Sequence, residues 1–594
     1  MERVSHNARY VLAFAASVAS WAFAPSLSIQ AAEVAAKTPE CPGDNGGLSL
    51  SPGFCATVFA DNLGHVRHMV VAPDNTLYAN TWSGRYFPKS PPPRGGFLLA
   101  LRDTKRSGRA DVVQRFGVTV EAGGTGGSGI ALYNGGLYAE ENGRILRYQL
   151  DAGSLLPTAP PRVVVSGLPL TGDHPMHPFI IDGQGSLFVD LGSATNACQS
   201  ENRIPRSPGL SPCVEKETRG GTWRFDADKT DQVFSAKERY ASGNRNGEGF
   251  AFDADGRLFV TQHGRDQLFQ DWPHLYTPQQ NAELPAEELL LLEKGADYGW
   301  PECYFDQKQG KLVLAPEYGG DGGKKIGDCA GRTPPVVAFP GHWAPNDLLI
   351  YHGTAFPAGY RGGAFIAFHG SWNRAPLPQQ GYNVVFQPLA EGRPSGAFVV
   401  FADGFAGAIK EPEKAAFRPT GLAEGPDGAL YVADDVRGRI WRIAYVGDGS
   451  DRVASAPARA ASSEGSALPP EGVHPDAGRA ARRLPVPPGS TADLVALGDR
   501  VFHGEAGEGT CSGCHGSDGG GTPQGPSLTT GRRLWSDGSL AGIQATIEKG
   551  VPSPKQYQGV MPPSGGAPLT RQELEAVAAY VWAIGHADQR NEER

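Results

Sequence analysis

The sequence has only four methionines, no long basic run and, beyond residues 10–24, no long apolar stretch. A net charge of −9 without a basic cluster argues against nucleic acid or an anionic membrane surface as a partner. Charged residues make up 20% and hydrophobic residues 40% of the 594 positions, which is typical of a globular protein. At this length we expect two or more domains, and we expect no stable membrane insertion.

The N-terminus has the pattern of an export signal. Arg3 and Arg9 precede the apolar segment 10–24, and small residues follow it. Cleavage is therefore expected between about residues 24 and 36. An uncleaved membrane anchor is the alternative, but the apolar segment is short for crossing a bilayer. We expect residues 1–36 to be signal peptide and N-terminal extension, and the mature protein to be periplasmic or secreted.

Cysteine is scarce, with eight residues, and two of these lie in one short motif near the C-terminus. The other six form three pairs that are local in sequence. An oxidising compartment permits disulfides, and pairing of nearest neighbours is favoured among many possible connectivities. Reduced cysteines in the core are the alternative. The favoured pairs are Cys41 with Cys55, Cys198 with Cys213, and Cys303 with Cys329.

Glycine (80 residues) and proline (49) are abundant, as in a mostly-β protein with many turns. From about residue 53 to 445 one pattern recurs: a turn, then leucine, an aromatic residue and a small or β-branched residue. Each copy follows another apolar strand, which predicts a β-hairpin. Six such units predict a six-bladed β-propeller over residues 37–446, with the repeated positions in its core. The residue after the turn is Leu77, Leu137, Leu187, Leu258 or Leu430 in these copies, and Phe365 in a looser copy.

Polar residues recur at a fixed distance before these copies. His174 and Arg245 stand thirteen residues before the leucine of their copy, and Arg418 stands twelve before its own. Each would start the inner strand of a blade, at the face where the second strands also end, near His263, His369 and Asp435. Several arginines at one channel mouth suggest a multiply anionic ligand, because guanidinium groups suit carboxylates. Scattered surface arginines are the alternative.

Three segments carry a family resemblance: residues 243–249, 262–266 and 295–301. They resemble the glucose/sorbosone dehydrogenase family of quinoproteins, and the sorbosone dehydrogenase-like branch most. Residues 173–174, 360–374 and 418–428 add to the likeness, which covers most of residues 53–445. The resemblance implies a six-bladed enzyme that uses pyrroloquinoline quinone (PQQ) and Ca²⁺ to oxidise an aldose or a sugar aldehyde.

The resemblance also implies residue roles. His174 would be the catalytic base, and Arg245 would orient the substrate and stabilise developing charge. The calcium bound to the quinone would be held by the backbone carbonyls of Gly264 and Arg265, and a structural calcium by Glu288 and Tyr298. The residues expected to bind PQQ are Asn246, His263, Arg374 and Arg418.

The sequence departs from the family pattern at several positions. Thr420 stands where the glucose dehydrogenases have a second arginine, and the family's lysine has no clear equivalent, so Arg374 is the substitute. His177 follows His174 by three residues and is a rival base.

Residues 447–489 are rich in alanine, serine and proline and predict a linker. In residues 490–594 the motif Cys511-Ser512-Gly513-Cys514-His515 predicts covalent haem c, with Cys511 and Cys514 as thioether positions and His515 as proximal iron ligand. A zinc site is excluded by the lack of a second ligand pair. Two apolar stripes predict terminal helices, the second opened by a capping box at residues 570–573, as in class I cytochrome c.

The second axial ligand of the haem is expected to be Met561, the only methionine of this all-α domain. His503 and His586 are the alternatives. The whole chain then predicts a quinohaemoprotein oxidoreductase that passes electrons from a small sugar through haem c to an external acceptor, such as a soluble cytochrome, an oxidase or a quinone pool. The alternative is a sugar- or protein-binding propeller without a catalytic cofactor, joined to an electron-shuttle cytochrome.

Overall fold

The computed structural model describes residues 41–587, except 83, 85, 88–89, 120–123, 125, 152, 450–451, 457–483, 523 and 558. The expected export signal and most of the expected linker lie outside the described residues. Ala454 and Ala456, near the start of the predicted linker, bond to the propeller instead of leaving it. The Ala454 carbonyl accepts from Ser51, and the Ala456 amide donates to Val400.

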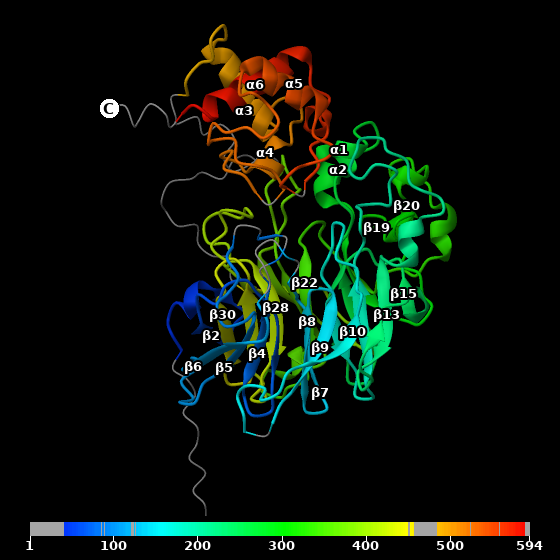
Figure 1. Ribbon diagram of the computed structural model, residues 1–594, viewed down its shortest axis with the longest axis vertical. Helices are drawn as coiled ribbons and strands as arrows, with labels where there is room; N and C mark the ends of the chain where they lie inside the picture. Colours follow the sequence, from blue (N-terminus) through cyan, green and yellow to red (C-terminus); the bar gives the residue numbers. More distant parts are fainter. Residues whose placement is uncertain are drawn as a thin grey trace, which may run out of the picture. The chain divides into compact units, whose positions relative to one another are not determined.

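Six antiparallel sheets form a β-propeller (Figure 1). The first blade contains β3 (Val66–Val71), β4 (Leu77–Thr81), β5 (Leu98–Arg102) and β6 (Val112–Phe116). The second contains β7 (Ile130–Tyr133), β8 (Gly136–Glu141), β9 (Arg144–Gln149) and β10 (Arg162–Ser166), with β14 (Gln232–Val233) added in parallel. The third contains β11 (Phe179–Ile181), β12 (Ser186–Leu191), β13 (Gly221–Asp226) and β15 (Arg239–Ser242).

The fourth blade contains β16 (Gly247–Phe252), β17 (Leu258–Gln262), β18 (Glu287–Leu291) and β21 (Val337–Phe339). The fifth contains β22 (Pro345–Ile350), β23 (Ala364–Phe368), β24 (Asn383–Gln387) and β27 (Val399–Asp403), edged by β1 (Ser49–Leu50). The sixth contains β28 (Pro419–Glu424), β29 (Leu430–Asp434), β30 (Ile440–Tyr445) and β2 (Phe54–Ala60). A small hairpin, β25 (Leu389–Ala390) and β26 (Arg393–Pro394), follows β24.

The innermost strands contact one another around a closed ring, in the order β3, β7, β11, β16, β22, β28 and back to β3. β2 comes from the N-terminal part of the chain and pairs antiparallel with β30, so the last blade contains strands from both ends of the domain. This arrangement confirms the six-bladed propeller expected from the repeats.

Each repeated leucine-aromatic unit is the second strand of a blade. The side chains of Leu77, Leu137, Leu187 and Leu430 are fully buried. Full burial of one such side chain stabilises the fold by about 2 kcal/mol. These residues are therefore core, as predicted, and carry no chemistry.

Two insertions extend the fourth blade. The short helices α1 (Leu268–Asp271) and α2 (Pro278–Glu283) lie between β17 and β18, and the hairpin of β19 (Cys303–Asp306) and β20 (Lys311–Leu314) lies between β18 and β21. Leu268, Tyr276 and Tyr304 form a small core shared by the two insertions. A disulfide joins Cys303 to Cys329 within the second insertion. The other two favoured pairs are also bonded, Cys41 to Cys55 and Cys198 to Cys213, which confirms nearest-neighbour pairing.

The C-terminal region is helical, as predicted. It contains α3 (Ala492–His503), α4 (Cys511–His515), α5 (Leu540–Lys549) and α6 (Arg571–Ile584). The capping box at the start of α6 is present. Gly498 lets α3 approach α6 closely, because a Cβ at this position would lie 2.0 Å from the Ala576 carbonyl oxygen. α5 was not predicted.

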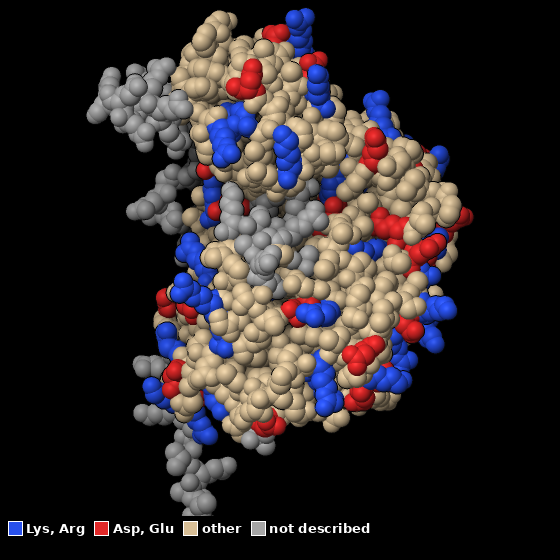
Figure 2. Space-filling model, in the orientation of Figure 1, with Lys and Arg blue, Asp and Glu red and all other residues tan. Residues whose placement is uncertain are grey.

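Over the described residues, no helix has both the length and the apolar character needed to span a bilayer. On the face drawn in Figure 2, basic and acidic side chains are interspersed rather than separated by sign.

Candidate functional site

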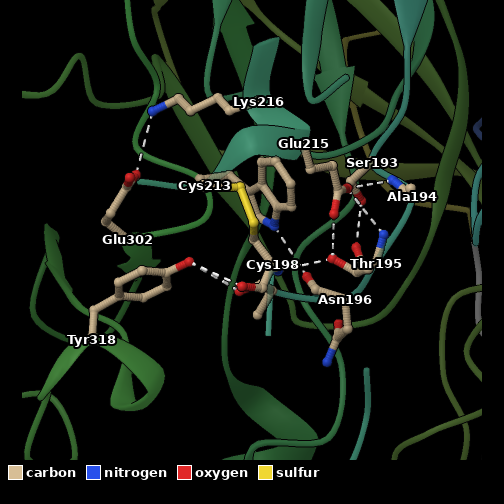
Figure 3. Close-up of a disulfide and its surroundings, with 12 residues drawn as sticks. Ser193, Ala194, Thr195, Asn196, Cys198, Cys213, Glu215, Lys216, Glu302 and Tyr318 are labelled. Carbon is tan, nitrogen blue, oxygen red and sulfur yellow. Dashed lines mark hydrogen bonds and ion pairs between the residues drawn. A yellow bond between two sulfur atoms is a disulfide. The ribbon is translucent and has the colours of Figure 1, made fainter. Parts of the chain in front are cut away.

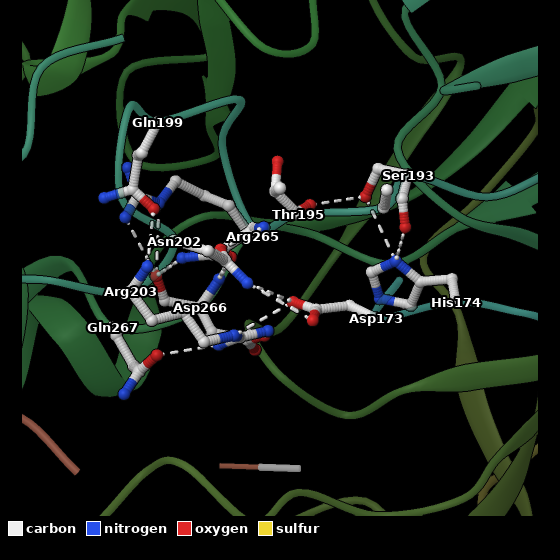
Figure 4. Close-up of polar contacts among 12 residues, drawn as sticks. Asp173, His174, Ser193, Thr195, Gln199, Asn202, Arg203, Arg265, Asp266 and Gln267 are labelled. Atoms are coloured by element: carbon white, nitrogen blue, oxygen red, sulfur yellow. Dashed lines mark hydrogen bonds and ion pairs between the residues drawn. The ribbon is translucent and has the colours of Figure 1, made fainter. Parts of the chain in front are cut away.

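His174 precedes β11, the inner strand of the third blade, and its side chain is 8% exposed. Its Nδ1 lies 2.8 Å from the carbonyl oxygen of Ser193 and 3.0 Å from the Ser193 Oγ (Figure 4). A carbonyl can only accept, so Nδ1 carries the proton and Nε2 presents a lone pair. Burial, then the nearby Arg245 charge, holds the pKa of His174 well below its usual value. His174 is therefore a neutral imidazole whose Nε2 has no hydrogen-bond partner among the described residues.

His177, the rival base, is fully enclosed. Its Nδ1 contacts the Glu140 carboxylate at 2.8 Å, and its Nε2 contacts the Pro169 carbonyl oxygen at 2.9 Å. Both ring nitrogens are engaged and the side chain has no exposed surface. This geometry gives His177 a structural position and leaves His174 as the histidine able to take a proton.

Arg245 lies beside His174 and is held by four hydrogen bonds. Its guanidinium donates to the carbonyl and the side-chain oxygen of Asn196, to the Gly264 carbonyl at 2.8 Å and to Asp266 at 3.1 Å. Asp266 also forms an ion pair of 2.9 Å with Arg203. Although burial opposes ionisation, the charges of Arg245 and Arg203 lower the pKa of Asp266. Arg245 is thus a rigid, buried cation at the mouth of the channel.

A series of polar contacts runs from Arg418 to Asn246, and packing against Gly192 extends it to His174. Arg418 donates to the carbonyls of His369 and Gly370, and His369 contacts Asp435 at 2.8 Å. Asp435 pairs with Arg67, which lies 3.6 Å from Glu248, and Glu248 accepts from Asn246. Asn246 and His174 both lie against Gly192, where an added Cβ would meet their atoms at 2.5 and 2.6 Å. The structure therefore brings His174, Arg245, Asn246 and Arg418 to one mouth.

Two further predicted cofactor residues have different surroundings. His263 directly follows β17, the second strand of the fourth blade, and its Nε2 lies 3.2 Å from the Pro345 carbonyl oxygen. Burial and the Arg245 charge lower the pKa of His263 to about 3, so it is neutral. Arg374 donates to the carbonyls of Ala282, Gly341 and Pro378. Its Nε and one of its two terminal nitrogens are thus engaged by backbone oxygens.

The predicted calcium positions lie near two buried carboxylates. Glu287 accepts from the Gly264 amide at 3.0 Å, and Glu288 accepts from Gln262 at 2.8 Å. The Gly264 carbonyl accepts from Arg245, and the Tyr298 hydroxyl donates to the Leu291 carbonyl. Within the described ranges, no group of three or more histidine, cysteine, aspartate or glutamate side chains could hold a metal ion.

Sequence reasoning missed two arginines of the mouth. Arg67 stands only ten residues before Leu77, so it fell outside the spacing that identified the other mouth residues. Arg203 lies in a long loop between β12 and β13, where no periodic pattern exists. It contacts Asp173, Asp266 and Gln267 (Figure 4). The only sequence feature near Arg203 that points to an ordered loop is the pair Cys198 and Cys213 on either side of it.

In the helical region the haem motif lines a largely apolar cavity. Cys511, Cys514, His515 and Met561 all line it, together with Val577 and Val581 of α6. His515 directs its Nδ1 to the Pro526 carbonyl at 2.9 Å, which leaves Nε2 for iron. The two cysteines are not joined to each other. This donor set fits a covalent haem.

The alternative axial ligands lie elsewhere. His503 directs Nδ1 at Asp499 and Nε2 at the Ser517 carbonyl, and His586 directs Nδ1 at the Trp582 carbonyl. Neither is among the residues that line the cavity, whereas Met561 is.

Curated relatives match only part of this chain. An uncharacterized protein of Borreliella burgdorferi is 27% identical over 214 residues, which are 35% of this chain and 49% of that protein. A pyrroloquinoline quinone-dependent pyranose dehydrogenase of Coprinopsis cinerea is 26% identical over 238 residues, covering 34% of this chain and 30% of that enzyme. The chain thus spans half or less of the length of these relatives.

Among solved structures, the calcium structure of a Trichoderma reesei carbohydrate-active enzyme of family AA12 has a TM-score of 0.53 at 18% identity. The match covers 67% of this chain and 97% of that one, and at this identity it supports the fold alone.

Family profiles account for both parts of the protein. Residues 495–585 match the cytochrome c profile, and residues 48–446 match the profile described as TrAA12-like. The recognition of a quinoprotein-dehydrogenase propeller fused to a cytochrome c is confirmed, while the sorbosone dehydrogenase-like branch stays a prediction. Since the match to the TrAA12-like profile extends over most of the sequence, the chain belongs to the TrAA12-like family.

Proposed function

We propose that this protein is a quinohaemoprotein sugar dehydrogenase, with PQQ at the propeller mouth and haem c in the helical domain. The proposed substrate is an aldose or a sugar aldehyde, which reacts as its cyclic hemiacetal or hydrate. The Coprinopsis cinerea relative, a pyranose dehydrogenase dependent on PQQ, supports a sugar of this class.

The observation that carries the proposal is the state of His174. Its Nδ1–H is committed to Ser193, so Nε2 can take the proton of a substrate hydroxyl. The resulting imidazolium is stabilised by the Ser193 carbonyl and by Asp266. Arg245 is positioned to hold the substrate oxygen as negative charge develops there. The hydrogen on the same carbon leaves as hydride, so the sugar loses one proton to His174 and one hydride, which together are two protons and two electrons.

The donor set of the mouth fits an anionic quinone. Arg418 has one terminal guanidinium nitrogen with no hydrogen-bond partner among the described residues, and its plane lies over Tyr382. Such a nitrogen suits a carboxylate. We propose that Arg418 and Asn246 hold PQQ, which when bound supplies the electrophilic carbonyl that accepts hydride.

Calcium remains part of the proposal. The carbonyls of Gly264 and Arg265 would hold it, and Ca²⁺ would supply Lewis acidity. The existing bond from Arg245 to the Gly264 carbonyl would then lengthen or break. Three disulfides support our proposal that the mature protein works outside the cytoplasm. Haem c would supply a one-electron acceptor, reduced twice for each sugar, and an external acceptor would reoxidise it.

The test is reconstitution of the full chain, purified with covalent haem, by PQQ and Ca²⁺. We expect aldoses to reduce the haem, seen as its reduced absorption bands, only when both are added. Omission of either one is the control. If no aldose or sugar aldehyde reduces the haem in the reconstituted protein, the enzyme proposal fails and the binding propeller with a shuttle cytochrome replaces it.

A further inference from the structure

The loop that follows β12 holds His174, and a carboxylate on a neighbouring turn holds that loop. We infer that Glu215 is a positioning residue for His174, which it orients through Thr195 and Ser193. The inference depends on one part of the proposed function, namely that His174 is the catalytic base. Glu215 lies on the 3₁₀ turn η2 (Val214–Glu217), outside the mouth contacts described above.

Glu215 fixes the backbone of the loop by three hydrogen bonds (Figure 3). Its Oε1 accepts from the amides of Ala194 and Thr195, and its Oε2 accepts from the Thr195 hydroxyl at 2.7 Å. The Thr195 Oγ1 in turn accepts from the Cys198 amide at 2.9 Å. A charged acceptor with three donors makes this a strong local attachment.

Thr195 then determines how Ser193 faces the imidazole. The Ser193 hydroxyl donates to the Thr195 carbonyl at 2.7 Å, so its oxygen faces His174 as an acceptor. The Ser193 carbonyl is a second acceptor, and the Ser193 amide donates to the Arg245 carbonyl. Two acceptors at Nδ1 select the tautomer with a proton on Nδ1, which leaves the lone pair on Nε2.

The turn that carries Glu215 is itself fastened. The disulfide between Cys198 and Cys213 joins the end of the loop to the residue before the turn. On the other side, Lys216 forms ion pairs with Asp297 at 2.9 Å and Glu302 at 3.3 Å. The carboxylate of Glu215 therefore has a fixed place from which to hold the loop.

Direct electrostatic influence on His174 comes from other groups. Arg245, Arg203 and Asp266 are the charged side chains that act on the imidazole, and Asp173 beside it is paired with Arg203. The Arg219 guanidinium contacts only the backbone carbonyl of His174. Glu215 does not contact His174 but acts through Thr195 and Ser193, so its effect is on the orientation and tautomer of His174.

The experiment compares Glu215→Ala with Glu217→Gln in the full chain, because Glu217 is an exposed carboxylate on the same turn. Diethyl pyrocarbonate modifies a free imidazole nitrogen, and peptide mass spectrometry follows the modification of His174 without any turnover. We expect Glu215→Ala to raise the modification rate at least about threefold and to lower kcat about tenfold to a hundredfold, with the acid limb of its pH profile displaced. Glu217→Gln should match the wild type.

Equal modification rates and equal pH profiles in the two variants would overturn the inference, even if Glu215→Ala were less stable. Should Glu215→Ala not fold, Thr195→Val keeps both amide bonds to Glu215 and removes only the hydroxyl. It should shift the reactivity of His174 in the same direction, and an unchanged rate would again refute the inference. If the wild type oxidises no sugar, the proposed function fails, but the modification rates still decide the role of Glu215.

Discussion

The carboxylate of Asp435, which follows β29 in the last blade, accepts a 2.8 Å hydrogen bond from the guanidinium of Arg67 in β3 of the first blade. Both side chains are at most 4% exposed. The pair lies where the propeller closes, and Asp435 also contacts His369 of the fifth blade. One buried carboxylate therefore links three blades at the mouth.

Replacement of Asp435 by asparagine should destabilise the propeller. Loss of one partner of a buried ion pair typically costs about 3–5 kcal/mol, and we expect the lower end of this range because Glu248 stays 3.6 Å from Arg67. Calorimetry of the full chain should show a lower melting temperature for the propeller. The matched control is Asp427→Asn in the same blade, where the carboxylate is 45% exposed in its pair with Arg442. Such a surface pair contributes about 0–1 kcal/mol. Equal effects of the two variants would contradict the role given to Asp435.

The blades could be predicted because their signal is local. Each repeated leucine follows a turn and is buried in a second strand, so composition and spacing are sufficient. The starting positions of His174, Arg245 and Arg418 follow from the same register. Arg67 was missed because it is the second residue of β3, whereas His174, Arg245 and Arg418 precede their inner strands.

Long-range contacts could not be predicted. His174 and His177 are three residues apart in sequence. The contact of His177 with Glu140, from the second blade, is what distinguishes the enclosed histidine from the other. Asp266 meets Arg203 through a loop without periodic pattern. In α5, Leu540, Ile543 and Ile547 do follow a helical spacing, but the helix is short and only the two isoleucines are buried, so its signal is weaker than that of α3 or α6.

The two histidines should separate catalysis from stability. His174→Gln should lower kcat by about a hundredfold to ten-thousandfold, because it removes the proton acceptor, with little change in melting temperature. His177→Gln should keep the rate but lose about 2–4 kcal/mol of stability, since Glu140 stays buried without its imidazole partner. Haem reduction by sugar and thermal melting measure the two effects. The reverse pattern would make His177 the base.

Met561 should set the potential of the haem. Axial ligands change haem potentials over a range of about 0.8 V, and a thioether raises them, so Met561→Ala should lower the midpoint potential by on the order of 0.1 V or more. Spectroelectrochemical titration measures this. Val560→Ala, a neighbouring buried position on the same cavity, should leave the potential nearly unchanged. An unchanged potential in Met561→Ala would exclude the methionine as ligand.

His503 should make the cytochrome domain less stable as pH rises. Its Nδ1 lies 3.0 Å from the Asp499 carboxylate and its Nε2 lies 2.6 Å from the Ser517 carbonyl oxygen. Both neighbours are acceptors, so the doubly protonated ring is favoured, and the pKa of His503 is raised although burial opposes this. A raised folded pKa gives stability that is complete below the unfolded value of about 6.5 and is lost as pH rises through the folded pKa. We expect this loss of stability between pH 6 and pH 9, and circular dichroism of the haem bands during melting would measure it. His503→Gln cannot titrate, so its melting temperature should be lower at pH 6 and should fall less towards pH 9. An equal pH dependence in the two proteins would assign the effect to another group.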